Sequence, residues 1–141
     1  RLPHAWIKAL PHNNVLGLTP LDVSYINEFN LKEIARRQFS TLDLVGFDSF
    51  TFLISSADAW KTKVDKIKAL LHRSSVKLKV WSVDQDFEFV DVQQRGLFSS
   101  GANWSNGGGL VVRPDQHILG QVEENMTAQD IAALITSHLG I

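Results

Sequence analysis

The segment from Phe50 to Val83 limits the possible folds most, because it combines both kinds of hydrophobic periodicity. Phe50–Ile54 is a short apolar run of β-prone residues, which predicts a strand. Apolar residues then recur with helical spacing on one face, at Trp60, Val64, Ile67 and Leu71. Val76–Val83 alternates lysine with apolar residues, which is typical of a half-buried strand. The segment therefore predicts a strand–helix–strand unit with its helix near residues 57–72.

A hairpin and a second helix follow this unit. Leu110–Val112 and Ile118–Val122 are apolar runs on either side of a Pro-Asp pair, and they predict two strands joined by a turn. Thr127 and Asp130 have the spacing of a helix capping box, and an apolar stripe continues from there. The sequence thus predicts a last helix near residues 127–139.

The order of these elements favours an α/β fold of the thioredoxin-like type. Phe39–Val45 predicts one further strand before the unit, and residues 84–109 predict a loop after it. A strand–helix–strand unit followed by a hairpin and a helix is the thioredoxin order, in which helices flank a mixed sheet. We therefore expect a domain over residues 39–141 with a mixed sheet of four or five strands.

Residues 1–38 do not show the same regularity. They contain three of the four prolines, and Thr19-Pro20 favours the start of a short helix. We interpret this region as a junction and an N-terminal extension, irregular or helical, ahead of the thioredoxin-like domain.

The composition excludes several kinds of chemistry. The chain has no cysteine, and Ser55-Ser56 stands at the strand–helix junction where a redox-active thioredoxin has C-x-x-C. Serine does not support dithiol exchange, so the redox function of that fold is excluded. Fourteen basic and fifteen acidic residues leave a net charge of −1, which indicates no nucleic-acid partner. No apolar run approaches the ~20 residues that span a bilayer, so we expect a cytoplasmic protein without a membrane partner.

Two further segments have a structural interpretation. Asn103–Gly109 is rich in glycine, but neither a lysine nor a predicted helix follows it as in a phosphate-binding loop. We expect a flexible connection there, with Trp104 buried or at a domain contact. Seven basic residues lie between positions 61 and 79, mostly off the apolar stripe, which predicts a solvated face.

Three segments match one known pattern in the right order over nearly the whole chain. They are Arg1–Trp6, Ser40–Leu44 with Phe50–Leu53, and Leu110–His117. They resemble the R-x-P-H-x-W, S-T-L-D-L…F-x-L-L and L-V-R-P-D-G-H stretches of class A FAD-dependent aromatic-ring hydroxylases, the phenol-hydroxylase type of flavoprotein monooxygenase. The resemblance is to their C-terminal, thioredoxin-like domain. The structural motif residues that it implies are Pro3, His4, Trp6, Asp43, Arg113, Pro114 and Asp115.

The resemblance implies that the redox chemistry belongs to another part of the protein. FAD and NAD(P)H would be bound by an N-terminal flavin-binding portion, since this chain has no G-x-G-x-x-G turn after a first strand. The chain itself would bind no cofactor or metal, and would pack on that portion or on the partner of a homodimer. Gln116 stands where the family usually has glycine, which indicates a different hairpin turn.

A second hypothesis is a free-standing protein with the same fold. It would bind a small ligand, or act as a cofactor-free isomerase or cyclase of secondary metabolism, with His4, His12 or Asp43 as acid–base groups. Structural contacts are the alternative for these polar residues, with Arg113 paired to Asp43 or Asp115. The five histidines share no metal-binding spacing. Whether the chain alone is an enzyme stays open.

The two hypotheses differ in what they expect of the apolar residues near the N-terminus. A domain covered by a flavin-binding portion would expose an apolar patch when isolated, whereas a free-standing protein would fold these residues inward. The candidate residues are Trp6, Ile7, Leu10, Val15, Leu16, Leu18, Ile26 and Phe29.

Overall fold

The main sheet has the mixed arrangement that the sequence predicts. The structure, a computed structural model, describes residues 1–9, 39–104 and 107–140. Four strands form this sheet in the order β4-β3-β6-β7. They are β3 (Phe50–Ile54), β4 (Leu78–Ser82), β6 (Gly109–Val112) and β7 (Ile118–Val122). β3 pairs in parallel with β4 and antiparallel with β6, and β6 pairs antiparallel with β7. This is the thioredoxin-like topology.

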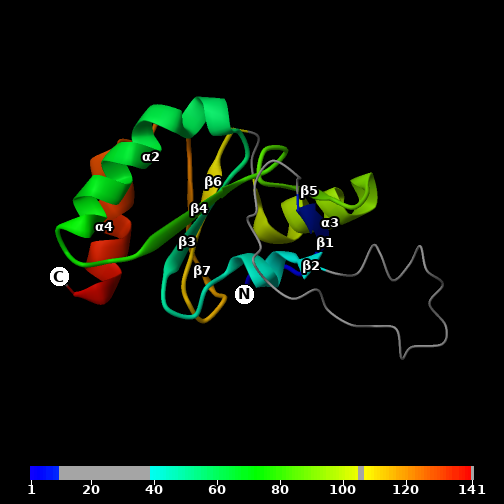
Figure 1. Cartoon of the computed structure of the whole chain (residues 1–141), viewed down its shortest axis with the longest axis horizontal. Coiled ribbons are helices and arrows are strands. Elements are labelled where there is room, and N and C mark those ends of the chain that lie inside the picture. Colours follow the sequence, from blue (N-terminus) through cyan, green and yellow to red (C-terminus); the bar gives the residue numbers. More distant parts are fainter. Residues whose placement is uncertain (10–38, 105–106, 141) are drawn as a thin grey trace.

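Helices α2 (Ala57–His72) and α4 (Ala128–Leu139) cover one face of this sheet, which we call the helical face (Figure 1). Both predicted helices are confirmed. Trp60 and Ile67 of α2 and Ile131 of α4 are fully buried against β3 and β6. α4 begins with the predicted capping box, in which the Thr127 side chain accepts a hydrogen bond from the N–H of Asp130 at 3.1 Å. The two helices of the helical face can thus be predicted from patterns between residues that are close together in the sequence.

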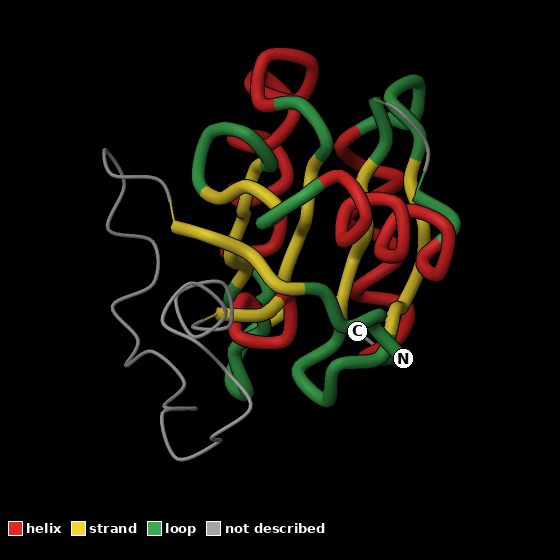
Figure 2. Tube along the Cα trace, turned by 90° about the vertical axis from the view of Figure 1, so that its right-hand side faces the viewer, coloured by secondary structure: helices red, strands yellow, loops and turns green. Residues whose placement is uncertain are grey.

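The opposite face, the composite face, is covered by a second sheet and a third helix (Figures 1 and 2). The second sheet has the order β2-β1-β5 and is antiparallel. Its strands are β2 (Phe39–Ser40), β1 (Trp6–Ala9) and β5 (Phe87–Phe89). The helix is α3 (Val92–Ala102), and its Phe98 is buried with Ile7 of β1 and Leu53 of β3 in one core cluster. The sequence did not predict this second sheet.

The strand predicted over Phe39–Val45 is wrong beyond Ser40. The chain turns there into the 3-10 helix η1 (Thr41–Leu44). The Ser40 hydroxyl accepts a hydrogen bond from the N–H of Leu42, and the Asp43 carboxylate accepts one from the N–H of Ser40 at 2.8 Å. This local capping satisfies backbone donors that a strand would leave to a neighbour, so the short helix forms in spite of the apolar β-prone residues.

The loop predicted over residues 84–109 is also wrong, because β5 and α3 lie within it. α3 begins at Asp91, whose carboxylate accepts a hydrogen bond from the N–H of Gln94 at 2.8 Å. It buries only Phe98 and Ala102 and contains Gly96 and Gly101. Two buried positions and two glycines do not give a helical stripe, and so the helix escapes a search for periodicity.

The N-terminal residues belong to the composite face as far as the structure describes them. Residues 1–9 pair through β1 with β2 and β5. Ile7 is only 2% exposed, which contradicts its expected place in an exposed apolar patch, and Trp6 is half-buried. The helix start expected at Thr19-Pro20 and the patch candidates from Leu10 to Phe29 lie outside the described residues.

Candidate functional site

The junction between β3 and α2 is where a redox-active thioredoxin would carry its cysteines. Here the backbone N–H and the hydroxyl of Ser55 both donate to the carbonyl of Gly108, at 3.1 and 3.0 Å. Ser56 is the cap residue of α2, but its side chain makes no capping hydrogen bond. No histidine, acid or lysine contacts the Ser55 hydroxyl, so nothing among the described residues activates it as a nucleophile.

The glycine-rich segment beside this junction is held in place where the structure describes it. Trp60 donates from Nε1 to the carbonyl of Gly107 at 2.9 Å, and Trp104 donates to Gly108 at 3.3 Å. Trp104 also packs edge-on against Phe98, with ring centroids 5.1 Å apart. The sequence predicts a flexible connection here, but hydrogen bonds from the two tryptophans hold it in place at Gly107 and Gly108. Trp104 is half-buried against this chain's own core.

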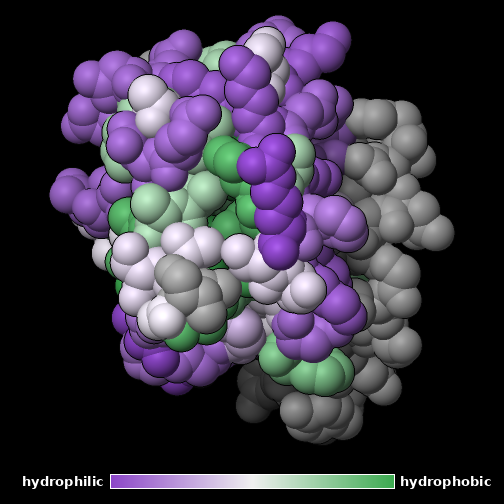
Figure 3. Space-filling model, turned by 90° about the vertical axis from the view of Figure 1, so that its left-hand side faces the viewer, coloured by the Kyte–Doolittle hydropathy of each residue, from purple (hydrophilic) through white to green (hydrophobic). Residues whose placement is uncertain are grey.

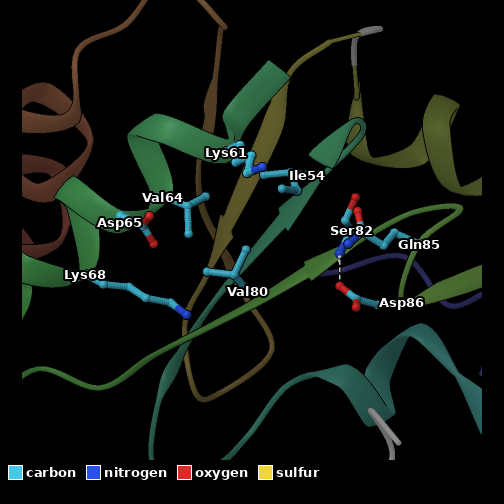
Figure 4. Close-up of a pocket in the computed structure, with 9 residues that line it drawn as sticks. All are labelled: Ile54, Lys61, Val64, Asp65, Lys68, Val80, Ser82, Gln85 and Asp86. Atoms are coloured by element: carbon cyan, nitrogen blue, oxygen red, sulfur yellow. Dashed lines mark hydrogen bonds between the residues drawn. The ribbon is translucent and has the colours of Figure 1, made fainter. Parts of the chain in front are cut away.

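A groove of about 350 Å³ lies beside the junction, between α2 and the edge strand β4 (Figure 4). Its apolar lining comes from Ile54, Val64 and Val80, and its polar lining from Lys61, Asp65, Lys68, Ser82, Gln85 and Asp86. A smaller hollow of about 230 Å³ adjoins it at Ser82 and Gln85 and reaches Ser55 and Ser56. Sequence reasoning did not find this groove, because the residues after Val83 were assigned to a loop.

The groove is suited to holding a ligand and has no evident acid–base pair. The buried carboxylate of Asp86 accepts a hydrogen bond from the N–H of Ser82 at 2.7 Å, which closes the turn after β4. Lys61 and Lys68 reach over the groove from α2, with Asp65 between them (Figure 4). None of the lining residues is a histidine. The lining combines two lysines and two aspartates, whose formal charges balance, with an apolar floor.

The three segments that carry the family resemblance meet in the structure. The N–H of Leu2 donates to the carbonyl of Gln116 at 2.7 Å. The hydroxyl of Thr41 donates to the carbonyl of Pro3 at 2.7 Å and accepts from the N–H of Ala5 at 3.1 Å. Thr41 is fully buried, and its own N–H donates to Ala5 at 2.9 Å. Sequence reasoning singled out Pro3 but missed Thr41, whose role depends on a contact between distant segments.

The acid–base candidates of the free-standing hypothesis do not form a cluster among the described residues. His4 is exposed and packs edge-on against Trp6, with ring centroids 4.6 Å apart. Asp43 is exposed and accepts from the N–H of Ser40. His12 lies outside the described residues. Neither His4 nor Asp43 lines the groove.

The predicted ion pair of Arg113 is present, and its partner is Asp115 rather than Asp43. Both residues belong to the turn between β6 and β7, which begins at Arg113 and includes Pro114, and their side chains are 36% and 46% exposed. Desolvation is the largest single influence and raises the pKa of Asp115. The hydrogen bond from the His117 N–H and the charges of Arg113 and His117 outweigh it, so the pKa stays below its ordinary value of 3.8. The pair stabilises a surface turn and has no catalytic geometry.

Gln116 takes the backbone conformation that favours glycine. Its φ is 70°, in the left-handed region. The N–H of Gln116 donates to the carbonyl of Arg113, and the N–H of Arg113 donates to the carbonyl of His117. This is a type I turn followed by a left-handed residue, a common hairpin connection. Gln116 thus adopts a backbone conformation that glycine takes more readily, and its side chain accepts a hydrogen bond from Arg1 at 3.1 Å.

Comparison with known proteins shows likeness at the level of the fold. No protein-family profile and no curated protein matches this sequence. The crystal structure of aklavinone-11 hydroxylase with FAD and aklavinone matches 100% of this chain, with a TM-score of 0.64 and 17% identity. The flavin-dependent monooxygenase PieE, in complex with FAD and substrate, matches 99% with a TM-score of 0.59 and 19% identity. This chain spans 21% and 19% of their lengths, about a fifth of each.

Two absences hold for the part of the chain that the structure describes. No helix there is long and apolar enough to cross a membrane. No group of three or more His, Asp or Glu side chains there is arranged as metal ligands.

Proposed function

We propose that this chain is a non-catalytic accessory domain of a cytoplasmic, FAD- and NAD(P)H-dependent aromatic-ring monooxygenase, in which it follows the flavin-binding portion. The observation that carries the proposal is the extent of the match to the two flavin enzymes. It takes in 100% and 99% of the chain, and thus the composite face, which the thioredoxin topology does not require. The three resembling segments support it further, because they join residues 1–6 to η1 and to the turn at Gln116.

The chemistry of the described residues supports a structural role. A flavin supplies hydride transfer and oxygen activation itself, and the protein around it supplies binding and orientation. This chain has no dinucleotide-binding turn in its sequence, and Ser55 occupies the position of the thioredoxin cysteines. We infer that the domain completes the protomer or its dimer and takes no part in electron transfer.

The proposal is tested on the native polypeptide. We expect it to contain bound FAD and to oxidise NAD(P)H faster when its aromatic substrate is added. Ser55→Ala and Lys61→Ala, at the junction and in the groove, should leave both the flavin content and the turnover rate unchanged. Loss of turnover in these variants at normal flavin content would contradict a non-catalytic role. For the isolated chain we expect no saturable quenching of FAD fluorescence, since no dinucleotide-binding turn is present.

A second candidate function is favoured by the groove alone. Its volume of about 350 Å³ is within the range of small-molecule sites. A free-standing protein of this fold would use the groove to bind a polar small ligand, with Lys61, Asp65 and Lys68 as charged contacts. The length of the native reading frame separates the two candidates, because only the first requires a flavin-binding portion ahead of Arg1.

A further inference from the structure

β4 lies at an edge of the main sheet, where β3 is its one partner among the described strands. The carbonyl of Lys77 accepts a hydrogen bond from the N–H of Phe50, so the backbone of Lys77 faces β3. Successive residues of a paired strand direct their backbone groups to opposite sides. Leu78, Val80 and Ser82 therefore direct theirs away from β3, toward the open edge.

Only the last of these three residues has its outward groups bonded within the described part of the chain. The N–H of Ser82 donates to the Asp86 carboxylate, and its carbonyl accepts from the N–H groups of Gln85 and Asp86. Leu78 and Val80 make no such bond with another described residue. The edge thus offers two N–H donors and two carbonyl acceptors in a row, which is the pattern that an added strand matches.

The groove lies beside this edge and provides contacts for side chains. Leu78 and Val80 pack toward the helical face, and Val80 lines the groove together with Val64 and Ile54 (Figure 4). Residues directly opposite each other on paired strands have their side chains on the same face of the sheet. Residues of an added strand opposite Leu78 and Val80 would therefore lie over the apolar floor, where apolar side chains fit.

Lys79, between these two residues, selects a charge. Its side chain points to the composite face, where its Nζ would be 3.2 Å from a Cβ added to Gly46. It is exposed and forms no ion pair with another described residue. Residues 61–79 contain seven basic residues and one acidic residue, Asp65, so the surrounding surface adds no compensating excess of negative charge. An acidic residue opposite Lys79 would form a favourable cross-strand pair.

We propose that the edge of β4 binds an extended segment of a partner protein as an added antiparallel strand, and that this segment has an apolar–acidic–apolar centre. Its apolar residues lie opposite Leu78 and Val80, and its acidic residue lies opposite Lys79. The antiparallel direction is the slightly more stable one per residue. Main-chain hydrogen bonds supply the affinity and the three side chains the specificity. The inference goes beyond the proposed function and does not require a flavin-binding portion.

The same contacts disfavour a second copy of the chain as the occupant. Antiparallel pairing of two copies through Leu78 and Val80 would place Lys79 directly opposite Lys79 of the second copy, and like charges in that position are destabilising. The polypeptide ahead of Arg1 is also disfavoured. Arg1 and Leu2 bind Gln116 in the turn between β6 and β7, and β3 separates these strands from β4.

The first test measures the choice of charge on the full native polypeptide. The probe is a capped, fluorescein-labelled heptapeptide with Val-Glu-Val at its centre, and a peptide with Val-Lys-Val at its centre is the control. We expect fluorescence anisotropy to show about tenfold tighter binding of the acidic peptide. Lys79→Glu should reverse this preference. Lys66→Glu makes the same change in charge at an exposed position of α2 outside the groove, and should keep the preference.

The second test examines the strand arrangement without changing the protein. A methyl group on the nitrogen of either valine removes a donor that faces β4, and should abolish binding of the acidic peptide. A methyl group on the glutamate nitrogen, which points away from β4, should leave the affinity nearly unchanged. The amides of Leu78 and Val80 should exchange about tenfold more slowly when the unmethylated peptide is bound.

Other outcomes overturn the inference. Equal affinity for the acidic and basic peptides would overturn the pairing with Lys79, and unchanged binding after valine methylation would overturn strand addition. Slow exchange of Leu78 and Val80 without peptide would show that the edge is already covered. The occupant would then be the polypeptide itself in a monomer, or a second copy where sedimentation shows a dimer. None of these results bears on the proposed function, which the flavin content tests separately.

Discussion

The two faces of the main sheet are equally well buried, but they are assembled in different ways. The helical face is covered by α2 and α4, each of which carries its apolar residues at helical spacing. The composite face is covered by β1, β2, β5, η1 and α3, which come from four separate stretches of the chain. The helical face was predicted from the sequence, and most of the composite face was not. Elements that are buried to the same degree therefore differ in how readily they can be predicted from the sequence.

The helices α2 and α3 show where the difference arises. The outer side of α2 is charged, and of the seven basic residues between positions 61 and 79 all but Lys63 are exposed. Hydrophilic residues accordingly gather over the side of the molecule on which α2 lies (Figure 3). The outer side of α3 is uncharged. A helix is recognised in a sequence by the contrast between an apolar and a charged side, and α3 lacks that contrast because it buries only Phe98 and Ala102 and its exposed side has few charged residues.

The largest expected effect compares one buried aromatic residue on each face. Trp60 of α2 and Phe98 of α3 are 0% and 1% exposed. We expect Trp60→Ala and Phe98→Ala each to lower the free energy of unfolding by about 3–5 kcal/mol, since each leaves a cavity. Urea unfolding followed by circular dichroism measures both. Leu97→Ala, beside Phe98 but exposed, is the control and should change stability by less than about 0.5 kcal/mol. A small loss for Phe98→Ala would mean that the composite face is loosely packed.

The next prediction concerns the bond that closes the composite face. Thr41→Val removes the hydroxyl that joins Pro3 and Ala5 and keeps the shape of the side chain. We expect a loss of about 1–3 kcal/mol, because the buried N–H of Ala5 and the carbonyl of Pro3 lose their partner. Thr62→Val, on the exposed side of α2, is the matched control. Equal urea midpoints for the two variants would show that the three motif segments are held together by other contacts.

A smaller effect separates the beginnings of the two helices. Asp91→Ala removes the side-chain cap of α3 and should lower stability by about 1 kcal/mol. Ser56→Ala should leave stability unchanged, because the Ser56 side chain makes no capping bond at α2. A side-chain cap thus contributes to the stability of α3 and not to that of α2. A larger loss of stability for Ser56→Ala than for Asp91→Ala in urea unfolding would contradict this difference between the two helices.

The smallest expected effect is the pH dependence of the turn that holds Arg1 and Leu2 on the composite face. Folding lowers the pKa of Asp115 and therefore favours its ionised form. Its contribution is complete above the ordinary value of 3.8 and is lost as the pH falls through the lower, folded-state pKa. The difference in thermal midpoint between the native chain and Asp115→Asn should be small, because the pair is exposed, and should disappear in acid. A difference that persists far below pH 3.8 would show that the carboxylate charge is not its cause.

The site features, like the two faces, differ in whether they could be predicted from the sequence. The loss of thioredoxin chemistry at Ser55-Ser56 and the pairing of Arg113 could be predicted, because both depend on residues near each other in the sequence. The groove lined by Lys61, Lys68 and Asp86 could not be predicted, because it forms where α2 meets the edge strand β4 and the turn after it, and that turn carries no motif. Thr41 was missed for a related reason, since its partners lie 36 and 38 positions away along the chain.

The sequence by itself determined the thioredoxin-like order of strands and helices, the two helices of the helical face and the absence of thiol chemistry. These follow from local periodicity, capping and residue type, which act between neighbours along the chain. Only the tertiary structure decided the second sheet, the uncharged exposed side of α3 and the meeting of residues 1–6 with η1 and the turn at Gln116. These depend on which distant segments bury one another's unpaired backbone groups and apolar side chains, and no local pattern specifies that choice.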